Sequence, residues 1–142
     1  MRDRTPVQSL ASVVGLVFLL VGILGFIPGI TTHYSDLAFA GHDSSAKLLG
    51  VFQTSVLHNI VHIAFGVGIL MAKTPEGART YLIGGGVAYL AVWLIGVIGG
   101  LEWLPVNAAD NWLHIVLGVG MIALGFVTGR SVQRTAPASS AV

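Results

Sequence analysis

Two segments of the chain carry the same pattern of side chains that could do chemistry. Residues 59–68 and 111–120 both read N-x-x-H-I-x-x-G-V-G, with six identical positions in ten at a constant offset of 52. Asparagine and histidine are rare in stretches as apolar as these, so shared hydrophobicity does not explain the match. The repeat therefore marks Asn59, His62, Asn111 and His114 as the residues at which to look for function.

Helical spacing predicts that each motif forms one polar stripe. Positions i, i+3 and i+7 of a helix share a face, so each Asn and His lies over the glycine of its motif, Gly66 or Gly118. Ser55 extends the first stripe, and His58 lies one turn before His62. A two-fold arrangement of the two helices would bring these stripes toward each other.

The leading interpretation of the stripes is structural. Small residues let helices approach closely in a membrane, and buried Asn and His side chains hydrogen-bond across the gap. On this interpretation the protein is a structural or accessory membrane protein, with no catalytic residue, metal or cofactor. The glycines expected at helix contacts are Gly66, Gly118, Gly96, Gly100, Gly125 and Gly129.

Two alternatives give the histidines a chemical role. Neutral imidazole binds haem iron and Zn, Cu or Fe ions, so His62 and His114 could clamp a haem b. His58 and His62, at i and i+4, could instead share one metal ion, and His114 is a further candidate metal ligand. Two observations count against a ligand: no carboxylate falls within the predicted spans, and those spans put His62 and His114 at different depths. The third hypothesis is a component of a proton or small-solute transporter, with the stripe as the path.

The composition identifies the solvent in which these residues work. Of the 142 residues, 54% are hydrophobic and 9% are charged, whereas a soluble domain carries about 25% charged residues. A soluble enzyme, a disordered protein and a basic nucleic-acid binder are all excluded. Cysteine is absent, so thiol chemistry is excluded as well. The bilayer is the expected partner, with a second copy or another membrane protein beside it.

Four apolar segments are long enough to span the membrane as helices. The expected spans are 10–27, 48–72, 81–101 and 112–128, which leave 28–47 and 102–111 as loops on one side. Residues 1–9, 73–80 and 129–142 fall on the other side, the last of them as a disordered tail. The predicted fold class is all-α, a polytopic four-helix transmembrane bundle.

The positive charges predict the orientation of this bundle. Six of the seven Lys and Arg residues fall in 1–9, 73–80 and 129–142, and the seventh is Lys47. Because Lys and Arg favour the cytoplasmic side, both termini are expected there, in a bacterial inner membrane. The two remaining loops then face outward.

The repeat extends beyond the two motifs. Residues of the first and third spans also match, more faintly, at an offset of 71. The chain is therefore expected to consist of two helical hairpins in parallel orientation, related by an axis along the membrane normal.

These features resemble a known family. The basic start with Pro6-Val7-Gln8, the repeated N-x-x-H-I-x-x-G and the polar loop after the first span are similar to a bacterial family of four-helix membrane domains of unknown function. That family is common in high-GC Gram-positive bacteria. The hairpin arrangement is also loosely similar to that of DoxX-type proteins. The resemblance implies the fold and the location, and it carries over no catalytic residue.

Overall fold

The computed structural model describes residues 4–41, 43–98 and 107–133. Its long helices are α1 (Pro6–Leu24), α2 (Val56–Val67), α3 (Pro75–Val97) and α4 (Ala108–Gln133). The 3-10 helix η2 (Gly68–Lys73) continues α2. Counting α2 and η2 together, four helices are long and apolar enough to cross a membrane. The prediction of an all-α four-helix bundle is confirmed.

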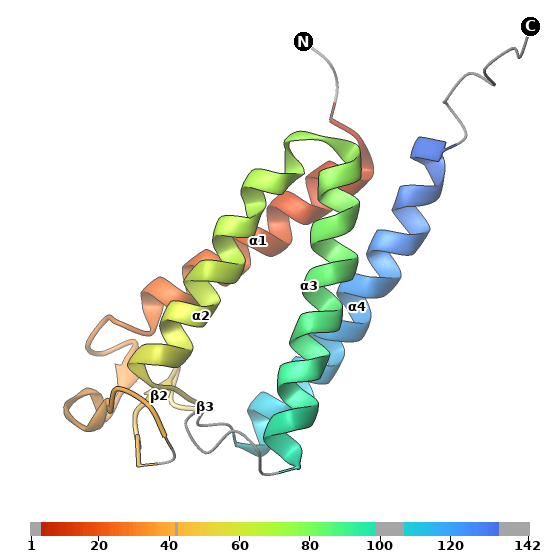
Figure 1. The fold of residues 1–142 in the computed structure, drawn as a ribbon. Coiled ribbons are helices and arrows are strands. Elements are labelled where there is room, and N and C mark those ends of the chain that lie inside the picture. The colour runs from red at the N-terminus through yellow and green to blue at the C-terminus, as the bar shows by residue number, and fades with distance from the viewer. Residues whose placement is uncertain (1–3, 42, 99–106, 134–142) are drawn as a thin grey trace, which may run out of the picture.

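The helices are arranged as two hairpins. Helix α1 packs along α2, and α3 packs along α4, whereas α2 and α4 pack little against each other. Figure 1 shows that the start of α1 and the end of α4 lie at one end of the molecule. Three short strands lie at the opposite end: β1 (Thr31–Thr32), β2 (Lys47–Leu48) and β3 (Phe52–Gln53). We call this opposite end the outer end, after the orientation predicted from the charges.

The outer end differs from the prediction. A helix was expected to begin at residue 48, but β1, β2 and β3 form an antiparallel sheet in the order β1-β2-β3, and α2 begins only at Val56. Leu49 and Gly50 have positive φ values of 53° and 73°, and Val51 N–H donates to Leu48 C=O (3.1 Å). An apolar run interrupted by such a turn forms a hairpin, although its hydropathy matches that of a membrane span.

The end of the molecule opposite to the outer end, which we call the inner end, has a shorter loop than expected. The predicted loop 73–80 is reduced to Thr74, because the Thr74 hydroxyl accepts from Gly77 N–H (3.0 Å) and Pro75 starts α3. An N-cap Thr followed by Pro is a strong signal for a helix start. Beside it, Gln8 Nε2 donates to the carbonyls of Ala72 (3.1 Å) and Lys73 (2.9 Å), which ties α1 to the end of η2.

The predicted ends of the other spans also shift. Helix α1 begins at Pro6 rather than at residue 10, since Thr5 and Gln8 form a capping box. Helix α4 begins at Ala108, so residues 108–111 are helical rather than part of the outer loop. Residues 99–106 and the predicted tail from 134 lie outside the described residues.

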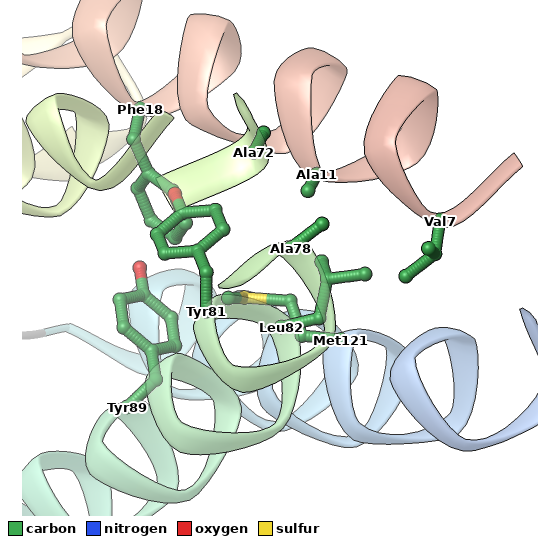
Figure 2. Packing of buried hydrophobic residues seen from close by; sticks show 9 residues of the cluster. All are labelled: Val7, Ala11, Phe18, Ala72, Ala78, Tyr81, Leu82, Tyr89 and Met121. Carbon is green, nitrogen blue, oxygen red and sulfur yellow. The ribbon is translucent and has the colours of Figure 1, made fainter. Parts of the chain in front are cut away.

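The core is small and lies between the two hairpins. Figure 2 shows Phe18 of α1 facing Tyr81 and Tyr89 of α3. Tyr81 Oη donates to the carbonyl of Phe65 (2.9 Å), linking α3 to α2. The other members of the core are Val7, Ala11, Ala72, Ala78, Leu82 and Met121. Much of the remaining apolar surface is exposed, as expected for helices that face lipid.

Glycines occupy the closest helix crossings. A Cβ atom at Gly66 would overlap Leu19 of α1, and one at Gly118 would overlap Leu90 of α3. Gly66 and Gly118 are related by the offset of 52, and Leu19 and Leu90 by the offset of 71, so the two hairpins make the same contact. Gly125 and Gly129 face Ile83 and Arg79 of α3 in the same way. Gly96 lies in α3, and Gly100 lies outside the described residues.

Candidate functional site

Two of the predicted histidines come from the first turns of α2. Ser55 caps this helix, its Oγ accepting from His58 N–H (3.1 Å). His58 and His62 follow at i and i+4, so they share a face, and their ring centroids lie 4.6 Å apart. Ser55 was expected to line a polar stripe. The structure instead shows it as the buried cap that starts the helix and so positions both histidines.

The third histidine comes from the first turns of α4. Asn107 Oδ1 accepts from Asp110 N–H (3.0 Å), and Asp110 Oδ2 accepts from Asn107 N–H (3.0 Å), which fixes the start of the helix. His114 Nδ1 lies 2.6 Å from the carbonyl oxygen of Asp110. Because a carbonyl oxygen only accepts, Nδ1 carries the proton and Nε2 keeps its lone pair.

The helix starts bring these residues to the same depth. Helix α2 begins at Val56 and α4 at Ala108, so His62 and His114 each lie six positions into their helix. The expectation that they lie at different depths is wrong, because it counted residues 48–53 as part of a span. One ring nitrogen from each of His58, His62 and His114 lies within 4.8 Å of the other two. The structure thus gathers three histidines into one cluster, which we call the histidine cluster.

Aromatic rings enclose the histidine cluster. Tyr89 of α3 stacks on His114 with centroids 4.5 Å apart, and its Oη lies 3.5 Å from His62 Nε2. Phe18 of α1 contacts His62 (centroids 5.9 Å apart) and Tyr89 (5.3 Å). His62 Nδ1 is buried and has no hydrogen-bond partner. Ring packing therefore surrounds His62, and the lone pair or N–H of its Nδ1 is left unused.

A cavity of about 80 Å³ adjoins the cluster beneath the turn between β2 and β3. A space of this size has room for an ion or a few water-sized groups, and most of the surface that faces it is apolar. It is lined by the three histidines, Tyr89, Asn59 and Asp110, and by hairpin residues such as Leu48, Phe52 and Gln53. Among the described residues that line it, Asp110 provides the one carboxyl group, and none is Lys or Arg. No positively charged side chain among these lining residues would therefore oppose a cation bound by the histidines.

Asp110 is the functional residue that the sequence reasoning missed. It was assigned to the outer loop, and the absence of a carboxylate from the spans was counted against a metal. The structure places it in the first turn of α4, 3% exposed, where its Oδ2 also accepts from Gln53 N–H (3.1 Å). The signal was present in the repeat: the offset of 52 that relates His62 to His114 also relates His58 to Asp110. The first turns of each helix thus carry a His or Asp that can bind a metal, an Asn at the next position, and a His three residues after the Asn.

The two asparagines take local roles. Asn59 Oδ1 accepts from Thr54 Oγ1 (2.6 Å), just before its own helix, and its Nδ2 is buried without a hydrogen-bond partner. Asn111 Oδ1 is likewise buried without a partner. The expected pairing of Asn and His between the two motifs is not among the hydrogen bonds of these residues. Asn59 bonds Thr54 and His114 bonds the Asp110 carbonyl, each within its own half of the chain.

Comparison with known proteins identifies the family of the chain. No curated protein and no solved structure matches the chain significantly. The family model described as "Domain of unknown function (DUF4383)" matches residues 8–127, which include both motifs and all four helices up to the last turns of α4. The chain therefore belongs to the DUF4383 family.

Proposed function

We propose that this protein binds a single divalent transition-metal ion in the membrane, through His58, His62 and His114. The observation that carries the proposal is the histidine cluster itself, with three imidazole nitrogens from two helices within 4.8 Å of one another. The sequence motif singled out His62 and His114, and the leading structural interpretation does not explain why His58 joins them.

The chemistry of the cluster selects the class of ion. Three imidazole ligands suit Zn, Cu, Ni, Co or Fe rather than Ca or Mg, which prefer oxygen. Three histidines with a position left for water is a common arrangement for zinc. His114 has the outer support typical of a metal ligand, because its Nδ1–H donates to a backbone carbonyl and orients the ring. Asp110, lining the same cavity, supplies a balancing carboxyl group.

The same geometry favours one ion over a haem. A macrocycle would need the space beside Gly66 and Gly118, which Leu19 and Leu90 fill. The cavity of about 80 Å³ is also far below the roughly 300–1,000 Å³ of ordinary small-molecule sites. His58 further crowds the expected axial pair, its ring centroid 4.6 Å from that of His62 and 6.0 Å from that of His114.

The setting of the site follows from the charge pattern. With Arg4, Lys73 and Arg79 at the end opposite to the sheet, we place that end in the cytoplasm of a bacterium and the histidine cluster near the outer face of its inner membrane. The proposal assigns no catalytic step. A metal site is compatible with self-association through lipid-facing helix surfaces and with a transport role. No described residue specifically supports either of these two roles.

Metal binding to the purified protein tests the proposal. In detergent, Co²⁺ should give the visible absorption of a tetrahedral site and Zn²⁺ should displace it, with one ion per chain by elemental analysis. His62→Ala and His114→Ala should each lower the affinity by at least 100-fold, because each removes one of three ligands. A Soret band in the preparation would instead establish haem.

The matched control is a histidine outside the cluster. His33 is exposed in the outer loop with a positive φ of 51°, a conformation that Asn adopts readily. His33→Asn should bind Co²⁺ as the parent protein does. Binding that is equally strong in the parent, His62→Ala and His114→Ala would reject the site, and circular dichroism would verify that the variants are folded.

A further inference from the structure

The histidine cluster joins two helices, α2 and α4, that pack little against each other directly. His58 and His62 belong to the α1–α2 hairpin, and His114 belongs to the α3–α4 hairpin. Each hairpin is held together by its own close packing, whereas α2 and α4 contribute little mutual contact. A ligand bound by all three histidines would therefore connect the hairpins.

Besides the ring contacts of Tyr89 with Phe18 and His62, the described residues link the hairpins at this end mainly through polar contacts. Gln53 N–H donates to Asp110 Oδ2 (3.1 Å), and Asn107 Nδ2 donates to the carbonyl of Val51 (2.7 Å). Both connect the turn region before α2 to the start of α4. At the inner half, by contrast, Tyr81 Oη bonds Phe65 and the core side chains fill the interface. The outer end is thus the part of this interface where an added ligand changes most.

The spacing of the nitrogens sets the direction of the change. In the structure they are spread over as much as 4.8 Å. Tetrahedral Zn²⁺ with Zn–N bonds of 2.0–2.1 Å requires ligand nitrogens about 3.3 Å apart. His114 has little freedom to close the gap by rotating, because Asp110 holds its Nδ1 and Tyr89 stacks on its ring. Rotation of the His58 and His62 rings and movement of α4 toward α2 are the motions that could supply the contraction.

Building on the proposed metal site, we propose that the ion acts as a clasp between the two hairpins, so that metal supply at the outer face sets how closely the outer ends of α2 and α4 are held. Occupied, the clasp draws the outer ends together and narrows their range of separations. Empty, it leaves them joined by the polar contacts and by the ring packing around Tyr89. The site thereby converts the presence of a metal ion into a change in the shape of the bundle.

Distances between spin labels test the clasp, and the absence of cysteine from the chain allows labels to be placed freely. An outer pair, Ile60→Cys and Val116→Cys, uses exposed positions of α2 and α4. An inner pair, Leu70→Cys and Val127→Cys, uses exposed positions near the other end. On adding Zn²⁺ in nanodiscs, the distance distribution of the outer pair should narrow and shift inward by about 1 Å, while that of the inner pair stays the same.

One variant distinguishes metal binding from the movement of the two hairpins toward each other. His114→Gln leaves His58 and His62, an i and i+4 pair on one helix that still chelates Zn²⁺ weakly. At saturating Zn²⁺ this variant should show no narrowing of the outer pair. If the parent protein binds Co²⁺ but its outer distribution is unchanged, or if both pairs narrow equally, the clasp is wrong and the metal site stands. If the parent binds no metal, both proposals fail.

Discussion

At the scale of single residues, Asp110 connects three features of the site. Its backbone carbonyl accepts from His114 and orients that ring. Its carboxylate Oδ2 accepts from Asn107 N–H at the start of α4, and also from Gln53 N–H of β3. A buried carboxylate in a membrane span is costly unless a partner balances it. Three neutral imidazoles carry no charge, so a bound cation would supply that partner.

Replacing this carboxyl group should weaken metal binding without unfolding the site. In Asp110→Asn the amide oxygen still accepts both N–H groups, but the balancing charge is lost. We expect the affinity for Zn²⁺, measured by Co²⁺ displacement, to fall about 10- to 100-fold. Asp36→Asn, at an exposed carboxylate in the outer loop, should leave it unchanged. An unchanged affinity in Asp110→Asn would show that its charge plays no part in binding.

At the scale of the elements, the hairpins depend on where glycine lies against a neighbouring helix. In α3, a Cβ at Gly86 would lie 2.7 Å from the carbonyl oxygen of Gly118 and 2.8 Å from Ile122 Cγ1. At Gly84, two residues away, no atom lies within 4 Å of such a Cβ. The same residue type therefore has opposite roles within half a turn: close packing at one position and open surface at the other.

These two glycines make a matched pair of substitutions. Gly86→Ala should lower the free energy of unfolding by about 1–3 kcal/mol, because α3 and α4 must move apart to admit the methyl group. Gly84→Ala should leave it unchanged or raise it by up to about 1 kcal/mol, since Ala favours the helix. Denaturation in mixed detergent micelles measures both. Equal effects in the two variants would contradict the close α3–α4 crossing.

At the scale of the whole molecule, two hairpins share a small core. The core residues Phe18, Tyr81 and Tyr89 join α1 to α3, and much of the remaining large apolar surface faces outward. A ligand that bridges the hairpins should therefore have a large effect on the stability of the bundle. Binding to the folded state alone adds free energy in proportion to the logarithm of ligand concentration.

Metal should accordingly protect the protein against unfolding. At a free Zn²⁺ concentration 100 times Kd, the free energy of unfolding should rise by about 2.7 kcal/mol. Thermal unfolding followed by circular dichroism, with and without Zn²⁺, measures the change, and a chelator should reverse it. His114→Ala should lose most of the gain at the same Zn²⁺ concentration. A gain that persists in that variant would point to metal binding elsewhere on the chain.

The sequence by itself determined the solvent and the class of fold. Low charge and long apolar runs require helices that satisfy their own backbone in lipid, and these follow from composition and length alone. The repeat at an offset of 52 also singled out His62 and His114. These properties are local, or periodic along the chain, so no knowledge of packing was needed to find them.

Only the tertiary structure decided how the site is assembled. Residues 48–53 are as apolar as a span, yet they form a hairpin because Leu49 and Gly50 turn the chain. That turn moves the start of α2 to Val56, which brings His62 level with His114 and adds His58 to the cluster. Hydropathy records how well a residue suits lipid, whereas the meeting of side chains from two helices depends on where each helix starts and how the two hairpins pack.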